Sequence, residues 1–217
     1  MRSLTPPRAA AAAAAPPSRA TTAVRAMASP PPPPAAARLA ALEAKVADVR
    51  ARFPDVPGIS PRNLRAAQAA AGARVVVVDV REAAEIAVSR IPGALSAAEF
   101  ERRRGELLAS DSAGGAAPMI VTYCTVGVRS AQYARKLLRG GGAADVRNLD
   151  GSILAWTHAQ LPLEEGGGGA GGAPTRRVHV FASDWALQAD GYEPVVFDRP
   201  LLALVRGRLP PWLGGAR

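Results

Sequence analysis

Residues 118–139 have the sequence Pro118-Met-Ile-Val-Thr-Tyr-Cys-Thr-Val-Gly-Val-Arg-Ser-Ala-Gln-Tyr-Ala-Arg-Lys-Leu-Leu-Arg139. Met119 to Tyr123 is a short apolar run with β-branched residues in its middle, which predicts a buried strand. From Ser130 onward, alanines and leucines recur at helical spacing and predict a helix with one apolar face. The stretch therefore predicts a strand, a tight loop and a helix in succession.

The loop between this strand and helix, Cys124-Thr-Val-Gly-Val-Arg129, contains the only cysteine of the chain. A helix N-terminus offers unpaired N–H groups and a partial positive charge, and Arg129 adds a full charge nearby. Both lower the pKa of a thiol from its free value of roughly 8.5. A lone cysteine is more often a small buried hydrophobe. Here Gly127, Arg129 and the helix start favour a reactive thiolate at Cys124.

The segments around this unit continue the alternation of strands and helices that is typical of α/β proteins. Residues 74–80 include four successive valines, which predict a central strand that is apolar on both faces, as in a parallel sheet. Asp79 and Arg81 fall at its C-terminal end, where ligands bind in open α/β sheets. Helices are predicted over 61–71, 81–89, 96–108 and 151–160, an extended segment and turn over 91–95, and a short strand over 146–149.

The N-terminal part of the chain differs in composition from the rest. Residues 1–35 are rich in alanine and proline and contain arginines but no acidic residue, which predicts a disordered organelle transit peptide followed by a proline-rich spacer. Plastid is the favoured address, with mitochondrion as the alternative. Residues 36–57 form the next unit, a helix with a narrow apolar stripe that we expect to dock on the domain, although a partner could also bind it.

The domain proper is assigned to residues 58–165, followed by a glycine-rich linker over 166–174. The linker lacks the Gly-Lys-Ser/Thr that completes a phosphate-binding loop. Residues 175–217 form a C-terminal extension with two predicted short strands, over 177–181 and 195–197. We expect its last residues, 200–217, to be a poorly ordered tail or a weak surface contact. The extension is the natural place for a protein partner to dock.

Composition excludes several classes of function. The formal net charge is +9, but five arginines and no acidic residue lie in residues 1–42, and taking these five charges from +9 leaves +4 for residues 43–217. No basic stripe interleaved with aromatics appears, so nucleic acid is not an expected partner. No apolar run is long enough for a membrane span. The two histidines, His158 and His179, have no metal-site spacing and are interpreted as structural.

Four motifs in order give the chain a family resemblance. They are Val78-Asp-Val-Arg-Glu82, Ile91-Pro-Gly-Ala94, Tyr123-Cys-Thr-Val-Gly-Val-Arg-Ser130 and Asn148-Leu-Asp-Gly-Ser-Ile-Leu-Ala-Trp156. In this order they resemble the single-domain rhodanese-like sulfurtransferases, specifically the plant and algal plastid members. The resemblance implies an α/β fold with a central parallel sheet of about five strands flanked by helices. It also implies that the cysteine loop forms a cradle at the C-terminal edge of that sheet.

The resemblance also assigns roles to individual residues. Cys124 matches the sulfur-carrying cysteine, and Asp79 and Arg81 match a pair near the domain entrance with a structural role behind the site. The chain departs from the family at Arg90, where histidine is usual, and at Ser152, where a second glycine is common; neither change puts activity directly in doubt. The loop whose backbone N–H groups point at the sulfur is matched by Thr125, Val126, Gly127, Val128 and Arg129, with Ser130 following.

The chemistry implied is transfer of sulfane sulfur through a persulfide on Cys124. A small anionic donor such as thiosulfate loads the sulfur, and cyanide, a thiol or a protein cysteine accepts it. No cofactor or metal is expected, and no histidine is placed as a general base. Phosphatases and arsenate reductases of the same fold have one more residue between cysteine and arginine, which makes them less favoured. A non-catalytic interaction or regulatory module in the plastid is the remaining alternative.

Overall fold

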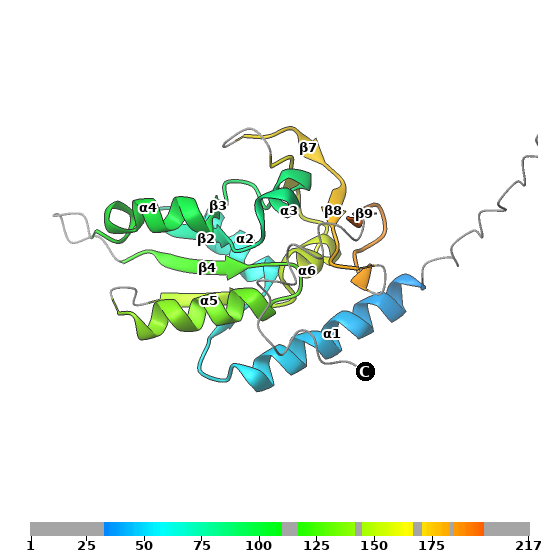
Figure 1. Cartoon of the computed structure of the whole chain (residues 1–217), viewed down its shortest axis with the longest axis horizontal. Coiled ribbons are helices and arrows are strands. Elements are labelled where there is room, and N and C mark those ends of the chain that lie inside the picture. The colour runs from blue at the N-terminus through cyan, green and yellow to red at the C-terminus, as the bar shows by residue number, and fades with distance from the viewer. Residues whose placement is uncertain (1–32, 110–116, 142–144, 167–170, 183–184, 198–217) are drawn as a thin grey trace, which may run out of the picture. The chain divides into compact units, whose positions relative to one another are not determined.

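The computed structural model describes residues 33–109, 117–141, 145–166, 171–182 and 185–197 (Figure 1). The predicted transit peptide and most of its spacer, the loop at 110–116, the centre of the glycine-rich linker and the tail from residue 198 lie outside the described residues. None of the helices in the described ranges is long and apolar enough to cross a membrane.

A five-stranded sheet, parallel throughout, forms the centre of the domain, in the strand order β1-β5-β4-β2-β3. Its strands are β1 (Gly58–Ile59), β2 (Val75–Asp79), β3 (Leu95–Ser96), β4 (Met119–Tyr123) and β5 (Asp145–Leu149). The α/β class and the sheet of about five parallel strands are confirmed. The edge strand β1 did not appear in the sequence interpretation, because two residues are too few to show alternation.

Along the described chain, the first helix precedes the sheet and each later helix follows one of its strands. The helices are α1 (Ala35–Arg52), α2 (Pro61–Ala69), α3 (Ala83–Val88), α4 (Ala97–Leu108), α5 (Val128–Arg139) and α6 (Ser152–His158). The cap predicted at Ser60 is present, since its hydroxyl accepts from the N–H of Asn63 at 3.2 Å. Helix α5 begins two residues earlier than expected, at Val128, so that Arg129 lies within its first turn.

Alternating side chains of the strands build two separate cores. Val78 of β2 and Ile120 of β4 pack with residues of α4 and α5 on one face. Val77 of β2 and Val121 of β4 face the opposite way and pack with residues of α1, α2 and α6. This burial on both faces explains the uninterrupted run of valines in β2.

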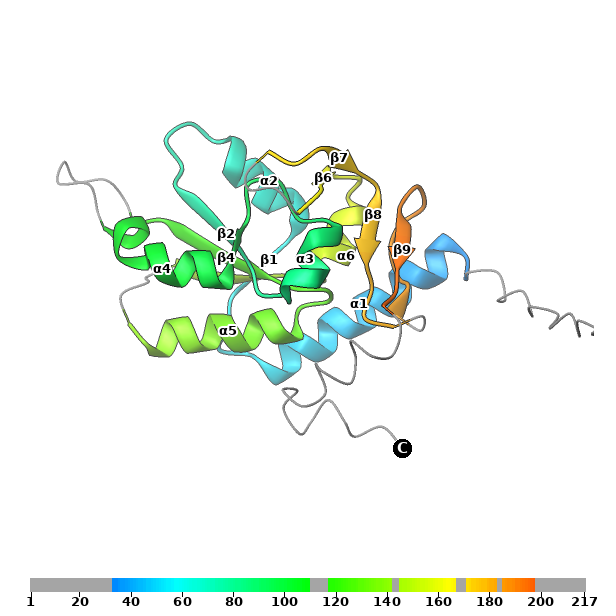
Figure 2. The same cartoon turned by 45° about the horizontal axis from the view of Figure 1, so that its top comes forward.

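Helix α1 docks on the domain, as its apolar stripe predicted. Leu42 packs in the core that contains α6, and further along the helix Val49 packs with Ala131 of α5. Figure 2 shows α1 passing below α5 and α6. At Gly151, directly before α6, a Cβ atom would lie 2.6 Å from the Cβ of Ala155 and 3.2 Å from a methyl carbon of Val46. Glycine at this position therefore allows α1 to approach α6 closely.

The C-terminal segment is part of the same core. Its described strands are β7 (Pro174–Thr175), which pairs antiparallel with β6 (Leu163–Glu164), and the parallel pair β8 (Arg177–His179) and β9 (Glu193–Val195). Five of its side chains lie in the core cluster that includes α1, α2 and α6: Val178, Val180, Leu187, Ala189 and Tyr192. The described part of the predicted extension therefore packs on the chain's own domain, and these side chains are not free to dock a partner.

Contacts with α1 and α6 hold this C-terminal segment in place. Arg38, which is buried in α1, donates to the carbonyl of Gln188 at 2.9 Å and pairs with Asp190. The ammonium of Lys45 lies 4.1 Å from the ring centroid of Trp185. The N–H of Ala189 donates to the hydroxyl of Thr157, in α6, at 3.0 Å, so the two ends of the described chain meet beside α6.

Candidate active site

Cys124 directly follows β4 at the carboxyl end of the sheet, and only 2% of the residue is exposed. The chain turns at Gly127, where φ is +121°. A Cβ atom at this position would lie 3.3 Å from Nδ2 of Asn148 and 3.7 Å from a methyl carbon of Val49. Both the positive φ and the limited space require glycine, and the turn folds the loop back over the cysteine.

Three groups of the loop stabilise negative charge on the sulfur. The N–H of Gly127 donates to Sγ of Cys124 at 3.2 Å, and the hydroxyl of Ser130 lies 3.6 Å from it. Burial raises the pKa of the Cys124 thiol, but the charge of Arg129 and the donors of Ser130 and Gly127 outweigh burial, so the pKa lies below its ordinary value. The loop therefore favours the ionised form of this thiol.

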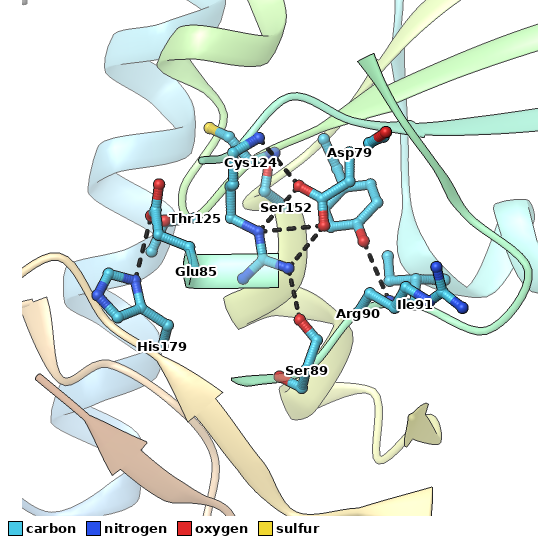
Figure 3. Close-up of polar contacts among 12 residues, drawn as sticks. Asp79, Glu85, Ser89, Arg90, Ile91, Cys124, Thr125, Ser152 and His179 are labelled. Carbon is cyan, nitrogen blue, oxygen red and sulfur yellow. Dashed lines mark hydrogen bonds and ion pairs between the residues drawn. The ribbon is translucent and has the colours of Figure 1, made fainter. Parts of the chain in front are cut away.

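The backbone of the loop is fixed from α6 and β5. The hydroxyl of Ser152, which lies beside Cys124 in Figure 3, accepts from the N–H of Cys124 at 3.1 Å. The N–H of Ile153 donates to the carbonyl of Cys124 at 3.3 Å. The Asn148 amide donates to the carbonyl of Gly127 at 3.2 Å. Ser152, which stands where a second glycine is common in the family, therefore holds Cys124 directly, although its φ of +52° would suit glycine.

Arg129 is held by a carboxylate that the sequence interpretation did not place in the site. Its Nη1 lies 2.7 Å from Oε2 of Glu85, and its Nη2 lies 2.8 Å from Oε1. The same Nη2 donates to the hydroxyl of Thr125 at 3.3 Å. Burial raises the pKa of the Glu85 carboxyl, but Arg129 and His179 outweigh it and hold the pKa well below its usual range. The charge of Arg129 is therefore shared between Glu85 and the sulfur.

Glu85 itself is oriented by the start of α3. Its Oε2 accepts from the N–H of Glu82 at 3.0 Å, which is half of a capping box. Ring nitrogen Nδ1 of His179, in β8, lies 3.1 Å from Oε1 of Glu85 (Figure 3). The His179 ring stacks on Phe197, with centroids 4.3 Å apart. The sequence indicated neither residue, because their proximity depends on how α3 and β8 pack together.

Asp79 and Arg81 form a buried pair behind the loop. Nη2 of Arg81 lies 2.6 Å from Oδ2 of Asp79 and also donates to the carbonyl of Ser89 at 2.7 Å. The guanidinium lies over the ring of Tyr123, whose hydroxyl accepts from the N–H of Ile91 at 3.1 Å. These contacts join the ends of β2 and β4 to residues 89–91 and fit the structural role expected from the resemblance.

Other residues singled out from the sequence have structural contacts. Arg90, where the family usually has histidine, is buried against Glu164, with Nε 2.8 Å from Oε1. The side chains of Val126 and Val128 pack into the hydrophobic core, so these two residues contribute to the loop through their backbone. In the described part of the chain, no three His, Cys, Asp or Glu side chains are grouped to hold a metal ion.

One family model matches the central part of the chain. Residues 60–159 match the model of the rhodanese-like domain. This part of the chain is therefore similar to a rhodanese-like domain, as the motifs of the sequence predicted. A search of curated proteins gave no match.

Similar solved structures carry different descriptions. One is a thiosulfate sulfurtransferase from Pseudomonas aeruginosa, with 26% identity, coverage of 64% of this chain and 25% of that chain, and a TM-score of 0.47. Another, from Rhodopseudomonas palustris, is described as a protein of unknown function and possible tyrosine phosphatase, with 22% identity, coverage of 57% and 93%, and a TM-score of 0.41. A rhodanese-like domain protein from Staphylococcus aureus has 26% identity, coverage of 46% and 91%, and a TM-score of 0.36.

Proposed function

We propose that this protein is a sulfurtransferase that carries sulfane sulfur as a persulfide on Cys124. The observation that supports the proposal best is the convergence of three groups on one sulfur atom: the N–H of Gly127, the hydroxyl of Ser130 and the charge of Arg129. A thiol whose pKa is lowered in this way has a larger thiolate fraction than a free cysteine, and the thiolate is the nucleophilic form.

The reaction follows from the position of that thiolate. Sγ of Cys124 attacks the outer sulfur of a donor such as thiosulfate, a new S–S bond forms, and the bond inside the donor breaks as sulfite leaves with its electron pair. A nucleophilic acceptor then attacks the outer sulfur of the persulfide, and the Cys124 thiolate leaves. The donors of the loop stabilise negative charge on Sγ at the start and end of this cycle.

Burial of Cys124 bears on which donors and acceptors can react. Only 2% of the residue is exposed, which favours small anions and extended thiols over folded protein surfaces. The charge of Arg129, whose side chain is 22% exposed, favours an anionic donor. The physiological donor is therefore proposed to be a small anion that carries sulfane sulfur.

Persulfide formation is the direct test. The full chain is treated with thiosulfate, and intact mass and peptide mapping are expected to find one added sulfur atom on Cys124, which cyanide then removes as thiocyanate. Cys124→Ser is expected to abolish both. Hydrolysis of an aryl phosphate without any persulfide would overturn the proposal in favour of a phosphatase.

A non-catalytic interaction module is the second candidate, and the burial of Cys124 is the observation that favours it. Under this alternative, no donor among thiosulfate, mercaptopyruvate and glutathione persulfide would load sulfur on the folded chain. If any of the three donors loaded sulfur on Cys124, the interaction-module alternative would be rejected.

We also propose that residues 1–35 direct the protein to the plastid, as in the plant and algal members that the sequence resembles. The proposal is supported by the abundance of arginine and alanine and the lack of acidic residues in this stretch. A fluorescent reporter that carries residues 1–35 is expected to enter plastids in a plant cell. Accumulation in mitochondria or in the cytosol would contradict this proposal.

A further inference from the structure

His179 reaches the charged cluster at Cys124 from outside the stretch that matches the family model. The match ends at residue 159, and His179 lies in β8, after the glycine-rich segment. The residue is 4% exposed, and its buried Nδ1 has no aligned hydrogen-bond partner among the described residues, while Oε1 of Glu85 lies 3.1 Å from it, within ion-pair distance. A polar nitrogen buried in this way needs a partner, and the carboxylate is the group placed to accept its proton.

Both oxygens of Glu85 are shared between two donors. Oε1 lies 2.8 Å from Nη2 of Arg129 and 3.1 Å from Nδ1 of His179. Oε2 lies 2.7 Å from Nη1 of Arg129 and 3.0 Å from the N–H of Glu82. Each additional donor takes up part of the negative charge of the carboxylate, so less of the charge of Arg129 is neutralised.

We propose that His179 is a positioning residue that acts on Cys124 through Glu85 and Arg129. A proton on Nδ1, 3.1 Å from Oε1 of Glu85, offsets part of the negative charge of that carboxylate, and Arg129 therefore directs more of its positive charge to the sulfur. His179 touches neither the sulfur nor a reacting group. The inference deepens the proposed function, but it concerns the ionisation of the thiol, which can be measured whether or not sulfur is transferred.

Charged groups from several elements face this cluster. Glu85 comes from α3, Arg129 from α5 and His179 from β8, and Arg81, which follows β2, lowers the pKa of Glu85 from behind. Cys124 is the fifth ionisable group and interacts with Arg129. Any change in the ionisation of the thiol therefore depends on all five of these side chains.

A purely structural role for His179 makes a different prediction. Its ring stacks on Phe197 at an interplanar angle of 29°, and such packing could be the reason for an aromatic residue here. Two variants separate the two roles. His179→Phe keeps the ring and removes the donor, whereas His179→Asn removes the ring and keeps an N–H donor near the position of Nδ1.

The experiment measures the rate of alkylation of the full chain by iodoacetamide as a function of pH. Cys124 is the only cysteine, so the rate reports a single thiol. His179→Phe is expected to react about threefold more slowly than wild type at pH 7, with the midpoint of the profile moved to higher pH. His179→Asn is expected to stay close to wild type. The proposal would be overturned if wild type and both variants had equal alkylation profiles, or if only His179→Asn were alkylated more slowly.

A measurement on the unmutated chain covers the case in which a variant fails to fold. Coupling is reciprocal, so alkylation of Cys124 has to change the environment of His179. The chain has two histidines, and the other, His158, has its Nε2 at 2.7 Å from the carbonyl of Leu187. Imidazole ¹⁵N resonances of His179 are expected to move on alkylation while those of His158 stay. Unchanged His179 resonances would overturn the inference.

Sulfur transfer is assayed on the same preparations. If the unmutated chain loads no sulfur, yet alkylation shows the expected order of the two variants, the proposed function fails and the role of His179 stands. If the chain loads sulfur and the two variants do not differ in their alkylation profiles, the role of His179 fails and the proposed function stands.

Discussion

Glu85 and Arg129 form a two-point ion pair, with nitrogen–oxygen distances of 2.7 and 2.8 Å, beside the candidate nucleophile. The pair joins α3 to the first turn of α5, and the Glu85 side chain is 8% exposed. Arg129 is therefore an anchored cation whose charge is divided between a carboxylate and a thiolate. The ionisation of the thiol depends on that division.

Replacement of Glu85 by glutamine tests this division directly. Glu85→Gln keeps the size of the side chain and removes its charge, so Arg129 has only the sulfur to balance it. The pKa of Cys124 is expected to fall further, and alkylation at pH 6 is expected to be about threefold faster than in wild type. Glu82→Gln, in the same turn of α3, is the matched control and is expected to leave the rate unchanged. A slower rate in Glu85→Gln would contradict the division of charge.

The same carboxylate makes stability depend on acid. The pKa of Glu85 is lower in the folded chain than in the unfolded chain, so its stabilising effect is complete above the unfolded value of about 4.3 and is lost as the pH falls below it. Wild type is expected to lose more unfolding free energy than Glu85→Gln between pH 5 and pH 3. Urea denaturation at these two pH values measures the difference. Equal losses of unfolding free energy in the two proteins would exclude Glu85 as the cause of the acid dependence.

Gly127→Ala tests the turn that closes the loop. Alanine at a φ of +121° is strained, and its Cβ would lie 3.3 Å from Nδ2 of Asn148. Unfolding free energy is expected to fall by about 1–3 kcal/mol, and the alkylation profile of Cys124 should move to higher pH as the N–H of residue 127 leaves the sulfur. Gly105→Ala, in α4 with open space around it, is the control and is expected to be neutral or stabilising.

Two substitutions of Ser152 separate its hydrogen bond from its backbone conformation. Ser152→Ala removes the acceptor for the N–H of Cys124 and keeps a residue strained at a φ of +52°, so a loss of about 1–2 kcal/mol is expected. Ser152→Gly loses the same acceptor but relieves the strain, so its loss should be smaller. Thermal denaturation ranks the variants, and a glycine variant less stable than the alanine variant would contradict this account.

Local patterns were sufficient to predict much of the fold. The four valines of β2, the cap at Ser60 and the helical spacing after Cys124 each depend on neighbours in the sequence, and each predicted element is present. The edge strand β1 is an exception, because it exists only through its pairing with β5 at Asn148 and Leu149. Pairing between distant segments has no local signal.

In the candidate site, too, residues close together in the sequence could be predicted and residues brought together by the fold could not. Cys124, Gly127 and Arg129 lie within one loop and could be singled out by their order in the sequence. Glu85 and His179 could not, since one lies 44 residues before Arg129 and the other follows the glycine-rich segment. Ser152 was visible in the sequence, but its contact with Cys124 depends on a backbone conformation that serine seldom adopts.

The two-stranded pair β8–β9 has a practical consequence for how this protein can be divided. The family match ends at residue 159, yet Val178, Val180 and Tyr192 fill the core that also contains Trp156. A chain trimmed to residues 60–159 would keep every motif of the resemblance and expose an apolar surface that the full protein covers. The packed core therefore extends beyond the recognised stretch in both directions, to α1 and to the segment that contains β8 and β9.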